Sequence, residues 1–273
     1  MRARKRFAQH FLEPVWVAKV VTAVNPQVGD AVVEIGPGRG ALTRPIAAAA
    51  GRLLAVEIDR DLAAELERDK PANVSVVCGD VLDLDLGAAI ATWLGAPFGP
   101  SHRVRIVGNL PYNISSPILF QLLTLAAATE GVTDAILMLQ REIADRLVAR
   151  VGTGDYGVLT ILTAIHADVT RVLALPPGAF RPAPAVHSAL VRLAFRPVQV
   201  EIPDHPAFVR MVRSMFTQRR KTLHNALKPF AADAHVPADE ALDAAGIDGR
   251  RRPETLNMKE LSGLIRAFQT PGS

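Results

Sequence analysis

The chain has 273 residues, of which 49% are hydrophobic and 21% charged, so it can bury a large apolar core and is not expected to be disordered or fibrous. The formal net charge is +4, and residues 196–273 carry 12 Lys and Arg against 9 Asp and Glu. The lone Cys78 excludes an internal disulfide, and no apolar run has membrane-spanning or signal-peptide character, so we expect a cytoplasmic protein without a membrane partner.

Short β-branched runs alternate with Ala/Leu-rich stretches over the first two thirds of the chain, which predicts an α/β fold with a mostly parallel, seven-stranded sheet. The expected strands are, in chain order, residues 31–35, 53–58, 74–78, 104–107, 135–139, 169–175 and 189–195. The expected helices between them are residues 41–50, 60–69, 117–128 and 141–150. Amphipathic patterns then predict helices at residues 207–217, 221–227, 238–245 and 258–268. We therefore expect a sheet domain at residues 1–200 and a small all-α domain at residues 201–273.

A glycine-rich turn follows the first expected strand. Gly36, Gly38 and Gly40 stand where the strand gives way to a helix, and glycines there let a ligand approach the backbone closely. The spacing G-x-G-x-G differs from the dinucleotide fingerprint G-x-G-x-x-G, which favours a nucleoside ligand over a nicotinamide dinucleotide. A plain strand-to-helix turn is the alternative interpretation.

Acidic residues follow the next two expected strands. Glu57 stands where a carboxylate can accept hydrogen bonds from ribose hydroxyls, and Asp80 could accept from the amino group of an adenine. Each has a structural alternative, because Glu57 could be a surface carboxylate and Asp80 the acid of a Gly-Asp turn. Asp59 could instead cap the helix that follows it.

The most informative segment is Asn-Leu-Pro-Tyr at residues 109–112, directly after an apolar strand. The Asn109 side-chain oxygen and the Leu110 carbonyl could both accept hydrogen bonds from an exocyclic amine on a flat heterocycle. Tyr112 could stack on that ring, while Pro111 would restrict the backbone. The set holds no group that titrates near neutral pH, so we expect positioning of the amine and no general base. A turn that closes a buried strand is the alternative.

Taken together, these motifs resemble, in order and spacing, the S-adenosylmethionine-dependent rRNA adenine N6,N6-dimethyltransferases over nearly the whole chain. Residues 5–12, 175–188 and 216–225 also carry the likeness. It implies a Rossmann-like methyltransferase domain followed by a helical RNA-binding domain. The last two segments point to the branch that dimethylates two adjacent adenosines near the 3′ end of 16S rRNA, with a role in small-subunit biogenesis. Ala8 and His10 stand where the family more often has Gly and Asn.

The resemblance also implies residue roles. S-adenosylmethionine would be contacted by His10, Leu12, Gly36, Glu57, Asp80 and Asn109. The target adenine would be held by Asn109, Leu110, Pro111 and Tyr112, with Phe180 as a second aromatic wall. A core or loop-anchoring role is the alternative for Phe180.

RNA phosphates would be contacted by Arg219, Arg220 and Lys221, with residues 2–6 and 250–252 as further basic candidates. Each cluster could instead be a solvated helix end. The implied partners are the small ribosomal subunit and its 16S rRNA, and we expect a monomer without a metal ion. Methylation of large-subunit rRNA or DNA, or a non-catalytic role in ribosome assembly, are the competing hypotheses, with a nicotinamide dehydrogenase as a more distant one.

Overall fold

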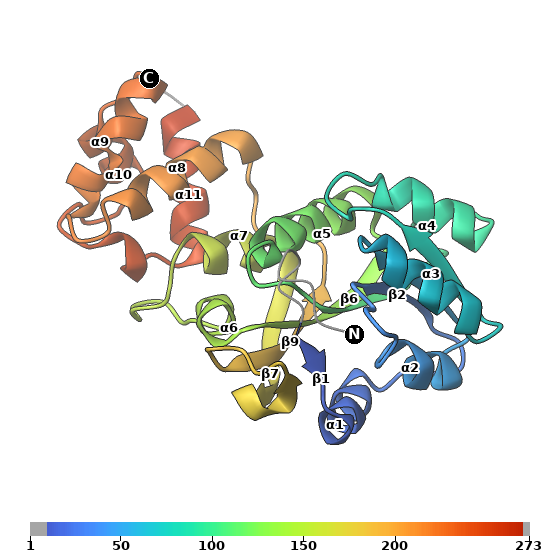
Figure 1. The fold of residues 1–273 in the computed structure, drawn as a ribbon. Helices are drawn as coiled ribbons and strands as arrows, with labels where there is room; N and C mark the ends of the chain where they lie inside the picture. The colour runs from blue at the N-terminus through green and yellow to red at the C-terminus, as the bar shows by residue number, and fades with distance from the viewer. Residues whose placement is uncertain (1–9, 270–273) are drawn as a thin grey trace. The chain divides into compact units, whose positions relative to one another are not determined.

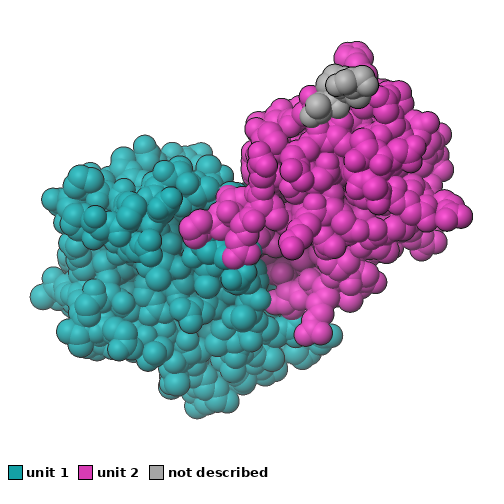
Figure 2. Space-filling view, turned by 180° about the vertical axis from the view of Figure 1, so that it is seen from behind, with its two compact units in different colours: residues 1–144, 166–196 teal, residues 145–165, 197–273 magenta. Residues whose placement is uncertain are grey.

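The computed structural model describes residues 10–269, which divide into two compact units (Figures 1 and 2). The basic residues 2–6 and most of the N-terminal motif lie outside the described residues. Unit 1 holds the chain up to residue 144 together with residues 166–196, and unit 2 holds residues 145–165 together with the chain from residue 197.

The longer segment of unit 2 begins at residue 197, close to the boundary expected near residue 200. Residues 145–165 were expected in the first domain but belong to unit 2. Backbone and side-chain hydrogen bonds tie this segment to a distant part of unit 2. The Gly152 N–H donates to the Glu254 carbonyl at 2.7 Å, and the Tyr156 hydroxyl donates to the Leu256 carbonyl at 2.9 Å. Such long-range pairing leaves no periodic signal in the sequence.

A seven-stranded sheet forms the centre of unit 1, in the order β4-β3-β2-β5-β6-β9-β7. The strands are β2 (Ala31–Ile35), β3 (Arg52–Glu57), β4 (Val74–Cys78), β5 (Val104–Asn109), β6 (Val132–Gln140), β7 (Ala167–Leu175) and β9 (Ser188–Phe195). Pairs among the first five strands of this order are parallel, and β9 is antiparallel to both neighbours. The predicted mostly parallel sheet is confirmed, with every expected strand present.

The helices of unit 1 are α1 (Pro14–Val24), α2 (Thr43–Ala49), α3 (Arg60–Asp69), α4 (Leu86–Leu94), α5 (Ser115–Thr129) and the start of α6 (Arg141–Leu147), whose last residues belong to unit 2. The sequence predicted four of them, and α1 and α4 were not expected. The helix-capping role suggested for Asp59 is confirmed, because its side chain accepts from the N–H groups of Asp61 and Leu62.

A small two-stranded sheet joins the N-terminal segment to a distant turn. Strand β1 (Phe11–Leu12) pairs antiparallel with β8 (Phe180–Arg181), which follows the short 3₁₀ helix η2 (Pro177–Ala179). These two-residue strands are too short to show an alternating pattern in the sequence. The pairing holds residues 10–12 beside the main sheet, which matters for the site described below.

Unit 2 is all-α. Its helices are α7 (Val158–His166), α8 (His205–Thr217), α9 (Leu223–Ala234), α10 (Ala238–Ala244) and α11 (Met258–Gln269), with the 3₁₀ helix η3 (Pro253–Thr255) before α11. The four helices predicted after residue 200 are present, whereas α7, which precedes them in the chain, was not expected. Helix α11 buries Leu261, Leu264, Ile265 and Phe268, a spacing that forms one apolar stripe. Phe268 meets Phe230 of α9 edge to face, with ring centroids 5.0 Å apart. Within residues 10–269, no helix is long and apolar enough to cross a membrane.

Candidate active site

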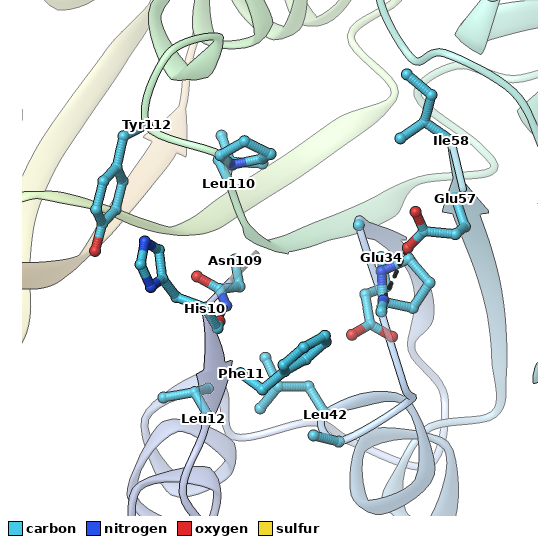
Figure 3. A pocket seen from close by; sticks show the side chains of 15 residues that line it. His10, Phe11, Leu12, Glu34, Leu42, Glu57, Ile58, Asn109, Leu110 and Tyr112 are labelled. Carbon is cyan, nitrogen blue, oxygen red and sulfur yellow. Dashed lines mark hydrogen bonds between the residues drawn. The ribbon is translucent and has the colours of Figure 1, made fainter. Parts of the chain in front are cut away.

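A cleft opens at the carboxyl ends of β2, β3 and β5, where the strand order of the sheet reverses (Figure 3). Open α/β sheets bind ligands at such a reversal because the loops after neighbouring strands diverge there. The lining comes from residues 10–12, from the turn after β2, from residues 57–58 and from residues 109–112. Four segments that the sequence singled out are thus brought together.

The glycine turn is shaped by residues in the left-handed region of backbone conformation. Gly36 has φ +69° and Gly38 has φ +57°, which residues with a side chain rarely adopt. A Cβ on Gly38 would also lie 3.2 Å from the Phe11 ring. The glycines therefore open the cleft to a ligand, and Phe11 is a lining residue that the sequence did not identify.

Glu57 holds this turn against the end of β3. One carboxylate oxygen accepts from the Gly38 N–H and the other from the Asp59 N–H, both at 2.9 Å. Burial raises the pKa of Glu57, and the two backbone hydrogen bonds partly oppose that rise. Only 4% of the residue is exposed, so the alternative of a surface carboxylate is wrong. Each oxygen keeps a lone pair that can accept from a ligand hydroxyl.

Glu34 is a second buried carboxyl in the cleft, and it was not among the residues predicted to lie there. It precedes the glycine turn on β2, is 2% exposed, and its Oε2 has no hydrogen-bond partner. Burial raises the pKa of Glu34 to about 7; the nearby Thr43 hydroxyl opposes part of that rise, and the negative charge of Glu57 adds to it. An acidic residue inside an otherwise apolar strand was the available sequence signal.

Asn109 ends β5, and its side-chain amide has a fixed orientation. The Nδ2 group donates to the main-chain carbonyl of His10 at 2.9 Å. Because the donor side of the amide is engaged in this way, Oδ1 is left as the acceptor on the cleft side (Figure 3). The contact depends on the position of residue 10, which the pairing of β1 with β8 maintains.

Tyr112 is held at both ends of its side chain. Its hydroxyl shares a 2.6 Å hydrogen bond with the Ser188 hydroxyl, and Ser188 is buried at the start of β9. Partial burial raises the pKa of Tyr112, so the phenol is neutral at physiological pH. The ring stacks on the His10 imidazole, with centroids 5.7 Å apart and planes inclined by 24°.

We expect Ser188→Ala to raise the KM for a substrate whose ring stacks on Tyr112 about threefold to tenfold and to change kcat less, because Tyr112 loses the contact that fixes its ring while the side-chain oxygen of Asn109 remains. Steady-state kinetics measure both constants. Ser188→Thr is the matched control, because it keeps the hydroxyl that contacts Tyr112 and should therefore keep the KM near the wild-type value. A kcat decrease with unchanged KM would contradict a role of Tyr112 in positioning the bound ring.

The structure does not bring every expected residue to the cleft. Phe180 is fully buried in the hydrophobic core and does not line the cleft, which corrects its assignment as an aromatic wall and favours the anchoring alternative. Asp80 also lies outside the lining, and its Oδ1 accepts from the Leu82 N–H at 2.9 Å in a turn. Leu12 lines the cleft with an almost buried side chain.

The basic residues of unit 2 differ in what their side chains contact. The Arg219 guanidinium donates to the carbonyls of Thr153 and Gly154, which uses two of its five N–H donors, so its phosphate contact stays a prediction. Arg220 and Lys221 are exposed. In the cluster 250–252, Arg250 pairs with Asp248, Arg251 pairs with Glu260 and Arg252 is exposed.

Comparison with known proteins places this geometry in a family. A family model described as ribosomal RNA adenine dimethylase matches residues 1–261. A protein named Ribosomal RNA small subunit methyltransferase A from Aromatoleum aromaticum is 44% identical, covering 95% of this chain and 91% of the relative. The protein of that name from Geobacter sulfurreducens is 40% identical, covering 100% and 97%.

Two solved structures share the fold over almost the whole chain. A dimethyladenosine transferase from Plasmodium falciparum has a TM-score of 0.76 at 24% identity, covering 95% of this chain and 98% of that one. The 23S rRNA methyltransferase ErmE has a TM-score of 0.66 at 26% identity, covering 95% and 100%. The fold is that of S-adenosylmethionine-dependent methyltransferases, and the chain belongs to the ribosomal RNA adenine dimethylase family.

Proposed function

We propose that this chain dimethylates N6 of two adjacent adenosines near the 3′ end of 16S rRNA, within the small ribosomal subunit, and thereby acts in subunit biogenesis. The observation that carries the proposal is the Asn109 amide, which the His10 carbonyl orients so that Oδ1 faces the cleft beside Tyr112. The proposal is also supported by relatives named for small-subunit rRNA methylation, which are 40–44% identical to this chain over more than nine tenths of their lengths.

The residues of the cleft fit S-adenosylmethionine. The glycine turn allows close approach to the backbone, and Glu57 has lone pairs that can accept from ribose hydroxyls. The buried, unpartnered Oε2 of Glu34 is an acceptor for the ammonium group of the cofactor's amino-acid part. When bound, the cofactor supplies an electrophilic methyl group on a sulfonium. Asp80 accepts one hydrogen bond at Oδ1 within the turn, and its carboxylate keeps lone pairs that could accept from the adenine amino group, as expected.

The chain's own contribution to the reaction is to position and polarise the target amine. An adenine N6 is a poor nucleophile because its lone pair is delocalised into the ring. Asn109 Oδ1 and the Leu110 carbonyl would accept from the N6 hydrogens and stabilise the positive charge that develops on nitrogen. Tyr112 would hold the base plane by stacking. None of these groups needs to remove a proton, which can leave to water after the transfer.

RNA suits this arrangement better than duplex DNA does. A base must leave its stack before its amine can enter the cleft, and single-stranded loops and ends of RNA expose bases without the cost of flipping them. We therefore assign the exposed Arg220 and Lys221 as phosphate contacts, in the helical unit proposed to bind RNA.

Replacing Arg220 and Lys221 together by Ala should weaken binding to small ribosomal subunits and flatten the dependence of log Kd on log salt concentration by about one to two units of slope. Each phosphate contact releases counterions, so its loss removes part of that dependence. Binding measured between low and moderate salt tests this. An unchanged slope would contradict the assignment.

Arg219→Lys is a matched control for that pair. It keeps the positive charge but loses the planar fork that donates to the Thr153 and Gly154 carbonyls. We expect the salt slope to stay at the wild-type value while the free energy of unfolding decreases by about 1 kcal/mol or more. Denaturant titration monitors the second quantity.

The decisive test of the proposed function is mass analysis of rRNA from cells with and without this protein. We expect two neighbouring adenosines near the 3′ end of the small-subunit rRNA to lose two methyl groups each when the protein is absent. Loss of methylation from the large-subunit rRNA instead would give the protein another substrate. Unchanged methylation with defective subunit assembly would favour a non-catalytic assembly factor.

A further inference from the structure

The His10 side chain lies between Tyr112 and Asn109, the two residues proposed to hold the target adenine (Figure 3). Its imidazole covers one face of the Tyr112 ring, with centroids 5.7 Å apart. The same residue's main-chain carbonyl receives the hydrogen bond from Asn109 Nδ2. One residue of the N-terminal segment therefore touches both sides of the proposed base site.

Several contacts keep the imidazole in this place. Its Nδ1 lies 2.8 Å from the Pro182 carbonyl, within hydrogen-bonding distance. The next residue, Phe11, pairs with Arg181 across the small sheet of β1 and β8. The ring is thus held by its stack, its hydrogen bond and the backbone that follows it, while it remains only partly buried.

The spacing leaves no room for a base between the two rings. Flat rings in contact lie roughly 3.5 Å apart, so a base inserted between Tyr112 and His10 would need them to separate to roughly 7 Å. The observed centroid separation of 5.7 Å is smaller. A base can therefore stack on this face of Tyr112 only if the imidazole moves away and its contact with Tyr112 is broken.

We propose that the His10 imidazole occupies the place of the target adenine in the ligand-free protein, so that the imidazole and the adenine compete for one face of Tyr112. This inference rests on the proposed function, because it takes adenine as the occupant of the site. His10 then acts as a positioning residue with two separate parts. Its carbonyl orients Asn109 throughout, whereas its ring leaves when the substrate base enters.

Competition predicts that removal of the ring strengthens base binding. The probe is adenosine, titrated into the full-length protein with S-adenosylhomocysteine at saturation, so that the cofactor cleft cannot take up the nucleoside. For His10→Ala we expect the Kd for adenosine to fall about 2-fold to 10-fold, which corresponds to the loss of one aromatic pair. His10→Asn, which keeps a polar side chain without a ring, should behave like His10→Ala.

Two further variants isolate the stacking. His10→Phe keeps a ring on Tyr112 and should leave the Kd for adenosine at or above the wild-type value. In a Tyr112→Ala background, His10→Ala should produce no gain, because the contested face is gone. A Kd that rises or stays unchanged in His10→Ala would overturn the proposal, and a rise would make His10 a second wall of the base site instead.

Proton NMR provides a readout that does not depend on affinity. His10 is one of seven histidines, and its ring signals, assigned from their loss in His10→Asn, should be shifted by the Tyr112 ring current. Tyr112→Ala should abolish that shift, and saturating adenosine should reduce it in the wild type. An unchanged His10 signal at saturation would overturn the proposal.

Methyl transfer to small-subunit rRNA by the wild-type protein, measured in parallel, separates the two hypotheses. Absence of methyl transfer contradicts the proposed function, whatever the Kd values for adenosine are. Normal transfer without a gain in His10→Ala contradicts only the competition between the imidazole and the adenine.

Discussion

Replacing Asn109 by Ala is expected to lower kcat about a hundredfold or more while the Kd for S-adenosylmethionine changes little. The loss is expected by analogy with the removal of one positioned hydrogen-bonding group from a preorganised catalytic site. In this chain the group is Oδ1, and its direction is set by the donation of Nδ2 to the His10 carbonyl. Single-turnover methyl transfer measures the chemical step, and calorimetry measures cofactor binding.

Asn109→Asp is the informative companion to that variant. It keeps an oxygen that can accept from the adenine amine but replaces the donor to the His10 carbonyl with a second oxygen. We expect activity between those of Asn109→Ala and the wild type, because acceptance survives while orientation is lost. Near-normal turnover in Asn109→Ala would contradict the assignment of Asn109 as the residue that holds the amine.

The strands and most helices could be predicted because their signals are local. A β-branched run such as β5, or a repeating apolar stripe such as that of α11, contains its own evidence for burial. Helices α1 and α4 are both mostly apolar in sequence, so neither presented a distinct apolar stripe. The pairing of β1 with β8 joins residues about 170 positions apart and leaves no mark in either segment.

Site residues could be predicted where the motif lies directly at the end of a predicted strand, because the strand determines where the backbone of the motif lies. Residues 109–112 end a strand at the carboxyl edge of the sheet, so their place in the cleft follows from topology. Phe180 and Arg219 show the limit of that reasoning. A motif indicates that an aromatic ring or a guanidinium is present, but the direction of the side chain depends on packing partners elsewhere, here the hydrophobic core and the carbonyls of residues 153–154.

Glu34 was missed for a related reason, and it gives the second large expected effect. In sequence it is one polar residue in a strand, whereas in the fold it is almost fully buried, with an unpartnered oxygen beside the carboxylate of Glu57. Burial raises its pKa from 4.5 to about 7, so between these two pH values the folded protein holds a proton on Glu34 that the unfolded chain would release.

The sign of the pH dependence follows from that difference in proton binding. Below pH 4.5 Glu34 is protonated in both the folded and the unfolded chain, so it does not change the free energy of unfolding. Between pH 4.5 and about 7 the unfolded chain loses this proton while the folded protein keeps it, so the free energy of unfolding falls as pH rises. Above about pH 7 both states are ionised and the loss is complete. A shift of this size corresponds to about 3 kcal/mol.

Glu34→Gln should remove this contribution because the amide does not titrate. The unfolding free energy of Glu34→Gln, relative to the wild type, is expected to rise by about 3 kcal/mol between pH 4.5 and pH 8, as measured by urea denaturation at a series of pH values. Parallel curves for the two proteins across this range would show that Glu34 does not change its protonation on unfolding.

Glu57→Gln is expected to give a different pattern, which separates burial from hydrogen bonding. Burial also raises the pKa of Glu57, but both of its oxygens accept from backbone N–H groups, at Gly38 and Asp59. A glutamine has one oxygen and must turn its amino group toward one of those donors, so this variant should lose stability even at pH 4.5. Glu34, whose Oε2 has no partner to lose, should show no comparable loss at that pH. The contrast identifies Glu57 as the carboxyl that maintains the glycine turn and Glu34 as the carboxyl that takes up a proton on folding.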